Sequence, residues 1–174
     1  MKSTRVVHLV GFAFPAATFA FLLAMYRSSH GQTVPVSGWA SLLVIVVIIV
    51  VLLALAFPIY RYRRALLELA KNQAAGKSTV GVKRPKRIDP FYAVRVLLLA
   101  KATGLALTLY FGWHLGLVLF QVSLPVVAEG VWLNAAGALV NLVGVVAAIV
   151  VERLCKIPGG TDEPPLDTGE ASAA

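Results

Sequence analysis

Two cations lie in an apolar stretch of the chain, where an ionised side chain is costly and therefore informative. Arg95 and Lys101 both belong to residues 95–116, RVLLLAKATGLALTLYFGWHLG, which are otherwise almost entirely apolar. A lysine at the centre of a lipid bilayer costs roughly 2.5–3.5 kcal/mol, and such residues usually face the interior of a helix bundle. Lys101 lies about ten residues, or ~15 Å of helix, beyond the expected start of this span at Phe91. We therefore expect it near the bilayer centre.

Small and polar residues follow Lys101 at helical spacing. Gly104, Thr108 and Gly112 come after it at intervals of three, four and four residues, which places all of them on one helix face. Small residues allow the backbones of two membrane helices to approach closely. We therefore predict that another helix packs on this face. Gly112 and Gly116 also form a small-xxx-small pair, which is a weak motif by itself.

A second face of this kind occurs near the end of the chain. Gly137, Asn141, Gly144 and Ala148 are spaced at intervals of four, three and four residues. The third and fourth spans are expected to be antiparallel, and counting from their shared boundary matches Asn141 in depth with Lys101. We therefore predict tight packing of these two spans, with the Lys101 amine bonded to Asn141 or to backbone carbonyls near Gly144.

The role of Lys101 has more than one interpretation. In a structural role its amine pairs within the helix interface, or snorkels to the headgroups on its flexible stem. In a functional role it binds an anionic group or transfers a proton. Arg95 lies only about one turn inside the membrane boundary, and Glu152, at the end of the fourth span, is its expected partner in a structural ion pair.

Other kinds of site are not indicated. His8, His30 and His114 have no carboxylate or cysteine at ligand spacing, so we predict no metal and no cofactor. GKST at 76–79 lacks the glycine and the preceding strand of a phosphate-binding loop, since Lys71 stands where that glycine belongs. No Ser-His-Asp set or pair of catalytic carboxylates is recognisable, which argues against an enzyme.

These residues must be positioned by a membrane-embedded fold. The chain has 174 residues, of which 59% are hydrophobic and 14% charged. Soluble domains are about half apolar and a quarter charged, so this composition indicates an integral membrane protein and excludes a large soluble core. A membrane-spanning helix needs about 20 apolar residues. We predict an all-α, polytopic fold with four such spans, at about residues 6–26, 40–60, 91–120 and 131–151.

The distribution of charge predicts the orientation of these spans. Residues 61–90, between the second and third spans, hold nine cations against two acids. The positive-inside rule places this basic loop in the cytoplasm, together with both chain termini. We therefore expect residues 1–156 to form one membrane domain. Residues 157–174, which are acidic and rich in Pro, Gly and Ser, are predicted to form a disordered tail.

A compact basic cluster lies within the loop between the second and third spans. For this cluster we expect contact with anionic lipid headgroups or with an acidic partner, and no nucleic-acid binding. Its members are Lys83, Arg84, Lys86 and Arg87.

Two segments resemble a known family. RIDPFYAVRVLLLAKATG at 87–104 and VERLCKIPGG at 151–160, with the four-span ending between them, are similar to an actinobacterial membrane-protein family catalogued as a domain of unknown function (number 3180). That family has no established activity. The resemblance therefore implies fold, membrane location and bacterial origin, and nothing catalytic. The positions that match are Pro90, Ala93, Arg95, Ala100, Lys101, Ala102, Gly112, Glu152, Cys155 and Pro158.

These observations favour one function and leave a second open. The first is a non-enzymatic accessory or scaffold subunit of a membrane or envelope assembly in the bacterial cytoplasmic (inner) membrane. Such a protein would act with a membrane-protein partner or as a homo-oligomer. The alternative is a small transporter or lipid-handling protein with Lys101 in its pathway.

Overall fold

The computed structural model describes residues 6–75, 89–125 and 130–155. Within these ranges the chain forms no strand, and all four of its helices are long and apolar enough to cross a membrane. This confirms the predicted all-α, four-span fold of a multi-pass membrane protein. The predicted cluster Lys83, Arg84, Lys86 and Arg87 and the predicted tail at 157–174 lie outside the described residues. The helices are α1 (Val6–Ser29), α2 (Trp39–Ala74), α3 (Pro90–Val122) and α4 (Val131–Cys155).

Local sequence signals set two of the helix ends. The Asp89 side chain accepts a hydrogen bond from the backbone N–H of Phe91 at 2.9 Å, and a proline occupies the first position of α3. At the end of α1, Gly31 has a positive φ of 68°. There the backbone N–H of Gln32 donates to the Arg27 carbonyl at 2.9 Å, as in a Schellman cap.

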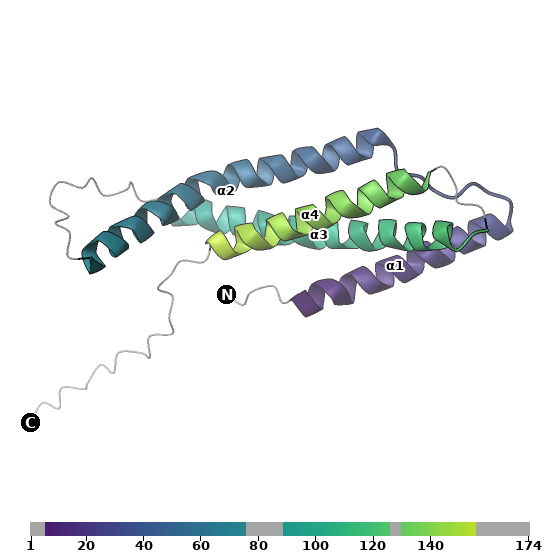
Figure 1. Ribbon diagram of the computed structural model, residues 1–174, viewed down its shortest axis with the longest axis horizontal. Coiled ribbons are helices and arrows are strands. Elements are labelled where there is room, and N and C mark those ends of the chain that lie inside the picture. The colour runs from purple at the N-terminus through teal and green to yellow at the C-terminus, as the bar shows by residue number, and fades with distance from the viewer. Residues whose placement is uncertain (1–5, 76–88, 126–129, 156–174) are drawn as a thin grey trace, which may run out of the picture.

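The four helices form a row in the order α1, α3, α4, α2 (Figure 1). α3 packs extensively on both α1 and α4, while α2 packs mainly on α4 and only slightly on α3. Figure 1 also shows that α1 begins at the end of the bundle where α4 finishes, which we call the terminal end. The connection at 30–38, between α1 and α2, lies at the opposite end.

α1 and α3 approach each other through small residues. A Cβ added at Gly112 would overlap the Ala13 carbonyl oxygen, and one added at Gly116 would overlap the Ala17 carbonyl oxygen. The two helix backbones are therefore in direct contact at both positions, as the small-xxx-small spacing suggests. Gly112 thus packs on α1 and not on α4, which corrects the expectation that it shares one helix-packing face with Gly104.

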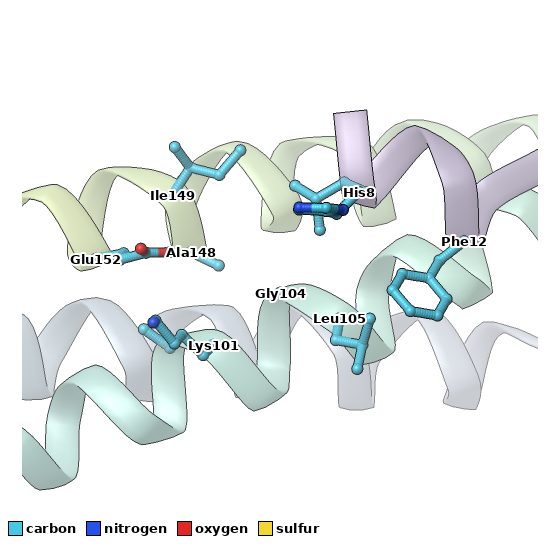
Figure 2. Close-up of a pocket in the computed structure, with 10 residues that line it drawn as sticks. His8, Phe12, Lys101, Gly104, Leu105, Ala148, Ile149 and Glu152 are labelled. Atoms are coloured by element: carbon cyan, nitrogen blue, oxygen red, sulfur yellow. The ribbon is translucent and has the colours of Figure 1, made fainter. Parts of the chain in front are cut away.

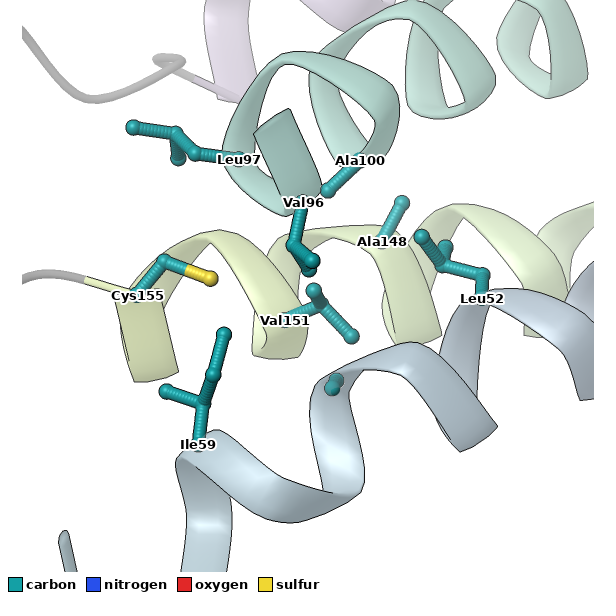
Figure 3. Packing of buried hydrophobic residues seen from close by; sticks show 9 residues of the cluster. Leu52, Ile59, Val96, Leu97, Ala100, Ala148, Val151 and Cys155 are labelled. Atoms are coloured by element: carbon teal, nitrogen blue, oxygen red, sulfur yellow. The ribbon is translucent and has the colours of Figure 1, made fainter. Parts of the chain in front are cut away.

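α3 and α4 also pack closely, as predicted. A Cβ added at Gly104 would lie 3.2 Å from the Ala148 Cβ, and one added at Gly144 would lie 2.5 Å from the Leu107 side chain. Towards the terminal end, residues of α2, α3 and α4 form one apolar cluster (Figure 3). Cys155 belongs to this cluster as a buried free thiol.

A proline and a tyrosine connect α2 to α3. Pro58 lies inside α2 and removes one backbone N–H from the hydrogen-bond ladder of that helix. Three residues earlier, the Leu55 carbonyl accepts a hydrogen bond from the Tyr92 hydroxyl at 2.8 Å. The first turn of α3 is thereby tied to α2 where the ladder is interrupted. Beyond this point α2 continues to Ala74, past the predicted end of the span at about residue 60.

Candidate functional site

A cleft of about 210 Å³ lies between α1, α3 and α4, towards the terminal end. Its charged and titratable side chains come from three different helices: His8 from α1, Lys101 from α3 and Glu152 from α4. The rest of its lining is apolar and includes Phe12 and Leu105. Figure 2 shows Lys101 and Glu152 pointing toward one another from facing helices. The site therefore combines opposite charges with an apolar wall.

Burial makes these two charges significant. Glu152 is only 5% exposed, and Lys101 is half-buried. Moving a single charge out of water costs several kcal/mol, and an opposite charge nearby offsets part of that cost. Lys101 and Glu152 line the same cleft with opposite charges, while His8 is exposed on the α1 side of it.

The depth of Lys101 differs from the sequence-based expectation. Gly104 packs on Ala148, and α3 and α4 are antiparallel, so Lys101 lies at the level of Glu152. Asn141 is seven residues, about 10 Å, on the other side of Ala148. The structure therefore brings Lys101 to Glu152 and not to Asn141.

The cause of this difference is the relative length of the two helices. The end of α4 at Cys155 packs in the same cluster as Val96 and Leu97, so the first turns of α3 extend beyond α4. Counting both spans from a common boundary therefore misaligned them. Arg95, the predicted partner of Glu152, is exposed on this overhanging part of α3, and Lys101 shares the cleft with Glu152 instead.

The other polar residues of the two predicted faces bond within their own helices. The Thr108 hydroxyl donates to the Gly104 carbonyl at 2.7 Å. The Asn141 amide donates to the Gly137 carbonyl, also at 2.7 Å. Both residues are buried. They therefore contribute to helix packing rather than to the cleft.

A second polar cluster, which the sequence analysis missed, lies at the opposite end. The Ser37 hydroxyl is 2.6 Å from Nε2 of His114, and Nδ1 of this histidine is 2.7 Å from the Tyr110 carbonyl oxygen. A carbonyl oxygen only accepts hydrogen bonds, so Nδ1 holds the ring proton. In the neutral ring, Nε2 then accepts the proton of the Ser37 hydroxyl.

Asn134 holds the connection between α1 and α2 against this cluster. Its Oδ1 accepts from the Ser37 backbone N–H at 3.1 Å, and its Nδ2 donates to the Pro35 carbonyl at 3.2 Å and to Oε1 of Gln121 at 3.1 Å. Asn134 and Gln121 are fully buried, and His114 is 4% exposed. One amide thus joins the connecting segment to both α3 and α4. Because its three hydrogen bonds cross-link these parts, we call it the Asn134 clamp.

Sequence reasoning missed this cluster because Ser37 and His114 are 77 residues apart, and Ser37 and Asn134 are 97 apart. One usable signal was present. His114 and Gln121 are seven residues apart in an apolar helix and so lie on one face. Gly137 marks the same place on α4, since a Cβ at this position would overlap the His114 ring.

No curated protein and no solved structure matches this chain. A family model described as "Protein of unknown function (DUF3180)" matches residues 9–159, which include the greater part of all four helices. This match covers most of the chain and confirms the family that its sequence resembles. The chain therefore belongs to the DUF3180 family of proteins of unknown function.

Proposed function

We propose that this protein binds a membrane phospholipid in the cleft between α1, α3 and α4. The observation that supports this is the pairing of a buried acid and a cation with an apolar wall in one membrane-embedded cleft. Lys101 would bind the phosphate of the headgroup, since an ammonium is a good partner for a phosphate oxygen. Phe12 and Leu105 would contact the apolar part of the lipid.

The depth of the cleft suits a headgroup. Glu152 lies three residues, about 4.5 Å, before the end of α4. At that end, the Arg63 guanidinium donates to the Arg153 carbonyl at 2.9 Å, so two arginines lie at the last turn of the helix. Such cations favour the polar surface of a membrane. On the predicted topology this surface faces the cytoplasm, where anionic lipids are available.

The test is native mass spectrometry of the full chain in mild detergent, titrated with phosphatidylglycerol. We expect Lys101→Met to weaken lipid binding roughly 10- to 100-fold, because a charge-assisted hydrogen bond contributes about 1.5–3 kcal/mol. Lys71→Met removes an equal charge from the exposed surface of α2 and is the matched control. Equal affinities for Lys101→Met and Lys71→Met would contradict the proposal.

A second candidate function, that of an accessory subunit, is favoured by α2. Residues 61–74 of this helix, which we call the α2 arm, project beyond the end of α4 (Figure 1). The arm exposes Leu66 by 40% and Leu67 by 58%, next to an Arg64–Glu68 ion pair of 3.2 Å. Exposed leucines on an amphipathic helix are a common feature of helices that dock into a groove.

Crosslinking in cells distinguishes the two candidates. A photoreactive amino acid at Leu67 should crosslink to one stoichiometric membrane-protein partner, and Leu66→Ser should abolish that product. Crosslinks from Leu67 only to lipid, with no protein product, would refute the accessory role. That result would not affect the lipid-binding proposal, which the titration with phosphatidylglycerol tests separately.

A further inference from the structure

We infer that Ser37 is an activated nucleophile and that His114 is its general base, which gives this protein an acyl-transfer activity on an ester of a membrane lipid. The inference is independent of the cleft at the terminal end, because the two sites lie at opposite ends of the bundle. It depends on the geometry around His114, on the start of α2, and on the depth of both in the membrane.

The hydrogen bond between Ser37 and His114 has the geometry of general-base activation. A serine hydroxyl is a weak nucleophile until an adjacent base accepts its proton, and the two groups must lie within about 2.6–3.2 Å. Here the Oγ–Nε2 distance is 2.6 Å. The Tyr110 carbonyl fixes the proton on Nδ1, so the lone pair on Nε2 faces the hydroxyl.

The surroundings hold both groups in this arrangement. The Asn134 clamp fixes the backbone on either side of Val36, so the position of Ser37 is set by α4. The His114 ring lies against Gly137, where a side chain would overlap it. A base and a nucleophile that are preorganised in this way need little rearrangement to react.

The start of α2 provides donors for a developing negative charge. The Gly38 carbonyl accepts from the backbone N–H groups of Ser41 and Leu42, at 3.0 and 3.4 Å, so the helix begins one residue after it, at Trp39, two residues beyond Ser37. The N–H groups of its first residues, Trp39 and Ala40, have no acceptor within the helix. Together with the positive end of the helix dipole, such groups stabilise an oxyanion.

The location indicates the substrate class. His114 lies 17 residues, about 25 Å, beyond Leu97, which is level with the other end of α4. Trp39 and Trp132, at the starts of α2 and α4, are 71% and 78% exposed, as is typical of aromatic side chains at a membrane surface. The ester carbonyls of phospholipids lie at this boundary between hydrocarbon and headgroups. This location therefore favours an acyl ester of a membrane lipid as the substrate of Ser37.

The reaction balances with water as the second reactant. Ser37 Oγ attacks the ester carbonyl carbon while His114 Nε2 takes the hydroxyl proton. The carbon–oxygen bond to the lipid alcohol then breaks, and the alcohol leaves with that proton. Water next attacks the acyl-serine, again losing a proton to His114, and releases the fatty acid and the free hydroxyl of Ser37.

A fluorophosphonate probe tests the inference on the full chain in mild detergent. Attack by Ser37 Oγ forms an oxygen–phosphorus bond and breaks the phosphorus–fluorine bond, with fluoride as the leaving group. Peptide mass spectrometry should find the adduct on Ser37. Ser37→Ala should lose it, and Ser41→Ala, which removes an exposed hydroxyl four residues further on, should keep it. His114→Gln should slow labelling at least about 100-fold, as expected for loss of a general base.

Two results would overturn the inference. One is a wild-type protein that is not labelled at Ser37, or that is labelled there no faster than at Ser41. The other is a folded His114→Gln variant that is labelled at the wild-type rate. If His114→Gln does not fold, the comparison of wild type with Ser37→Ala and Ser41→Ala still decides the matter.

Discussion

Replacement of Gly116 by alanine should separate α1 from α3. An added Cβ at this position overlaps the Ala17 carbonyl oxygen and lies 2.9 Å from the Ala20 Cβ. Both obstacles belong to a helix backbone or to a short side chain, so neither can rotate away. The helices must instead move apart by about 1 Å, which forfeits a substantial fraction of the dispersion energy of the atoms in contact.

The expected cost is about 1–3 kcal/mol of unfolding free energy, the usual range for an overpacked interface. Among the described residues the backbone of α1 closely approaches only that of α3, so α1 has no second extensive interface to compensate. Gly11→Ala is the matched control. It makes the same chemical change in α1, where an added Cβ would meet nothing within 4 Å. We expect it to be neutral or slightly stabilising, because alanine favours a helix over glycine.

The assay is unfolding by increasing dodecyl sulfate in mixed detergent micelles, followed by Trp113 fluorescence. Trp113 is half-buried at this interface, with its ring centroid 6.2 Å from that of Phe19. Trp39 and Trp132 are exposed, and phenylalanine at both positions isolates the signal. Equal unfolding midpoints for Gly116→Ala and Gly11→Ala would refute close backbone packing as the basis of this interface.

Three further predictions concern polar contacts. Tyr92→Phe removes the bond to the Leu55 carbonyl and should lower the unfolding free energy by about 1 kcal/mol; an unchanged midpoint in the same titration would contradict this. Asn134→Ala removes three hydrogen bonds and should make the connection between α1 and α2 a preferred site of limited proteolysis. If the variant and the wild type are cleaved there at the same rate, the clamp is unimportant. Glu152→Gln and Lys101→Met should each destabilise the protein, and the double variant should cost less than the sum of the two, because each single change leaves one buried charge uncompensated. Strict additivity in this double-mutant cycle would mean that the two charges do not interact.

The number and kind of helices were predictable because lipid imposes a strong constraint on length and composition. Four apolar segments of sufficient length permit few other folds. Small residues at helical spacing likewise indicated which faces pack, as Gly104 and Gly144 confirm. Such signals are local, since each one is read within a single span.

The registration between helices was not predictable in the same way. It depends on how far each helix extends beyond the membrane, and this places Lys101 opposite Glu152 and not Asn141. The contact between Ser37 and His114 was equally hidden, because it joins a connecting segment to the interior of a distant helix. Neither residue is distinctive on its own. Only the spatial order of the helices brings them together.

That order has a consequence for biosynthesis. The first two helices to leave the ribosome, α1 and α2, have no close backbone contact among the described residues, because α3 and α4 lie between them. After insertion each has only lipid as a neighbour until α3 is made and supplies the glycines that α1 needs. The Asn134 clamp belongs to α4, so the connection between α1 and α2 is secured only when the last helix arrives. The later helices therefore secure the earlier ones, and a nascent chain that stops before α4 leaves its first connection open.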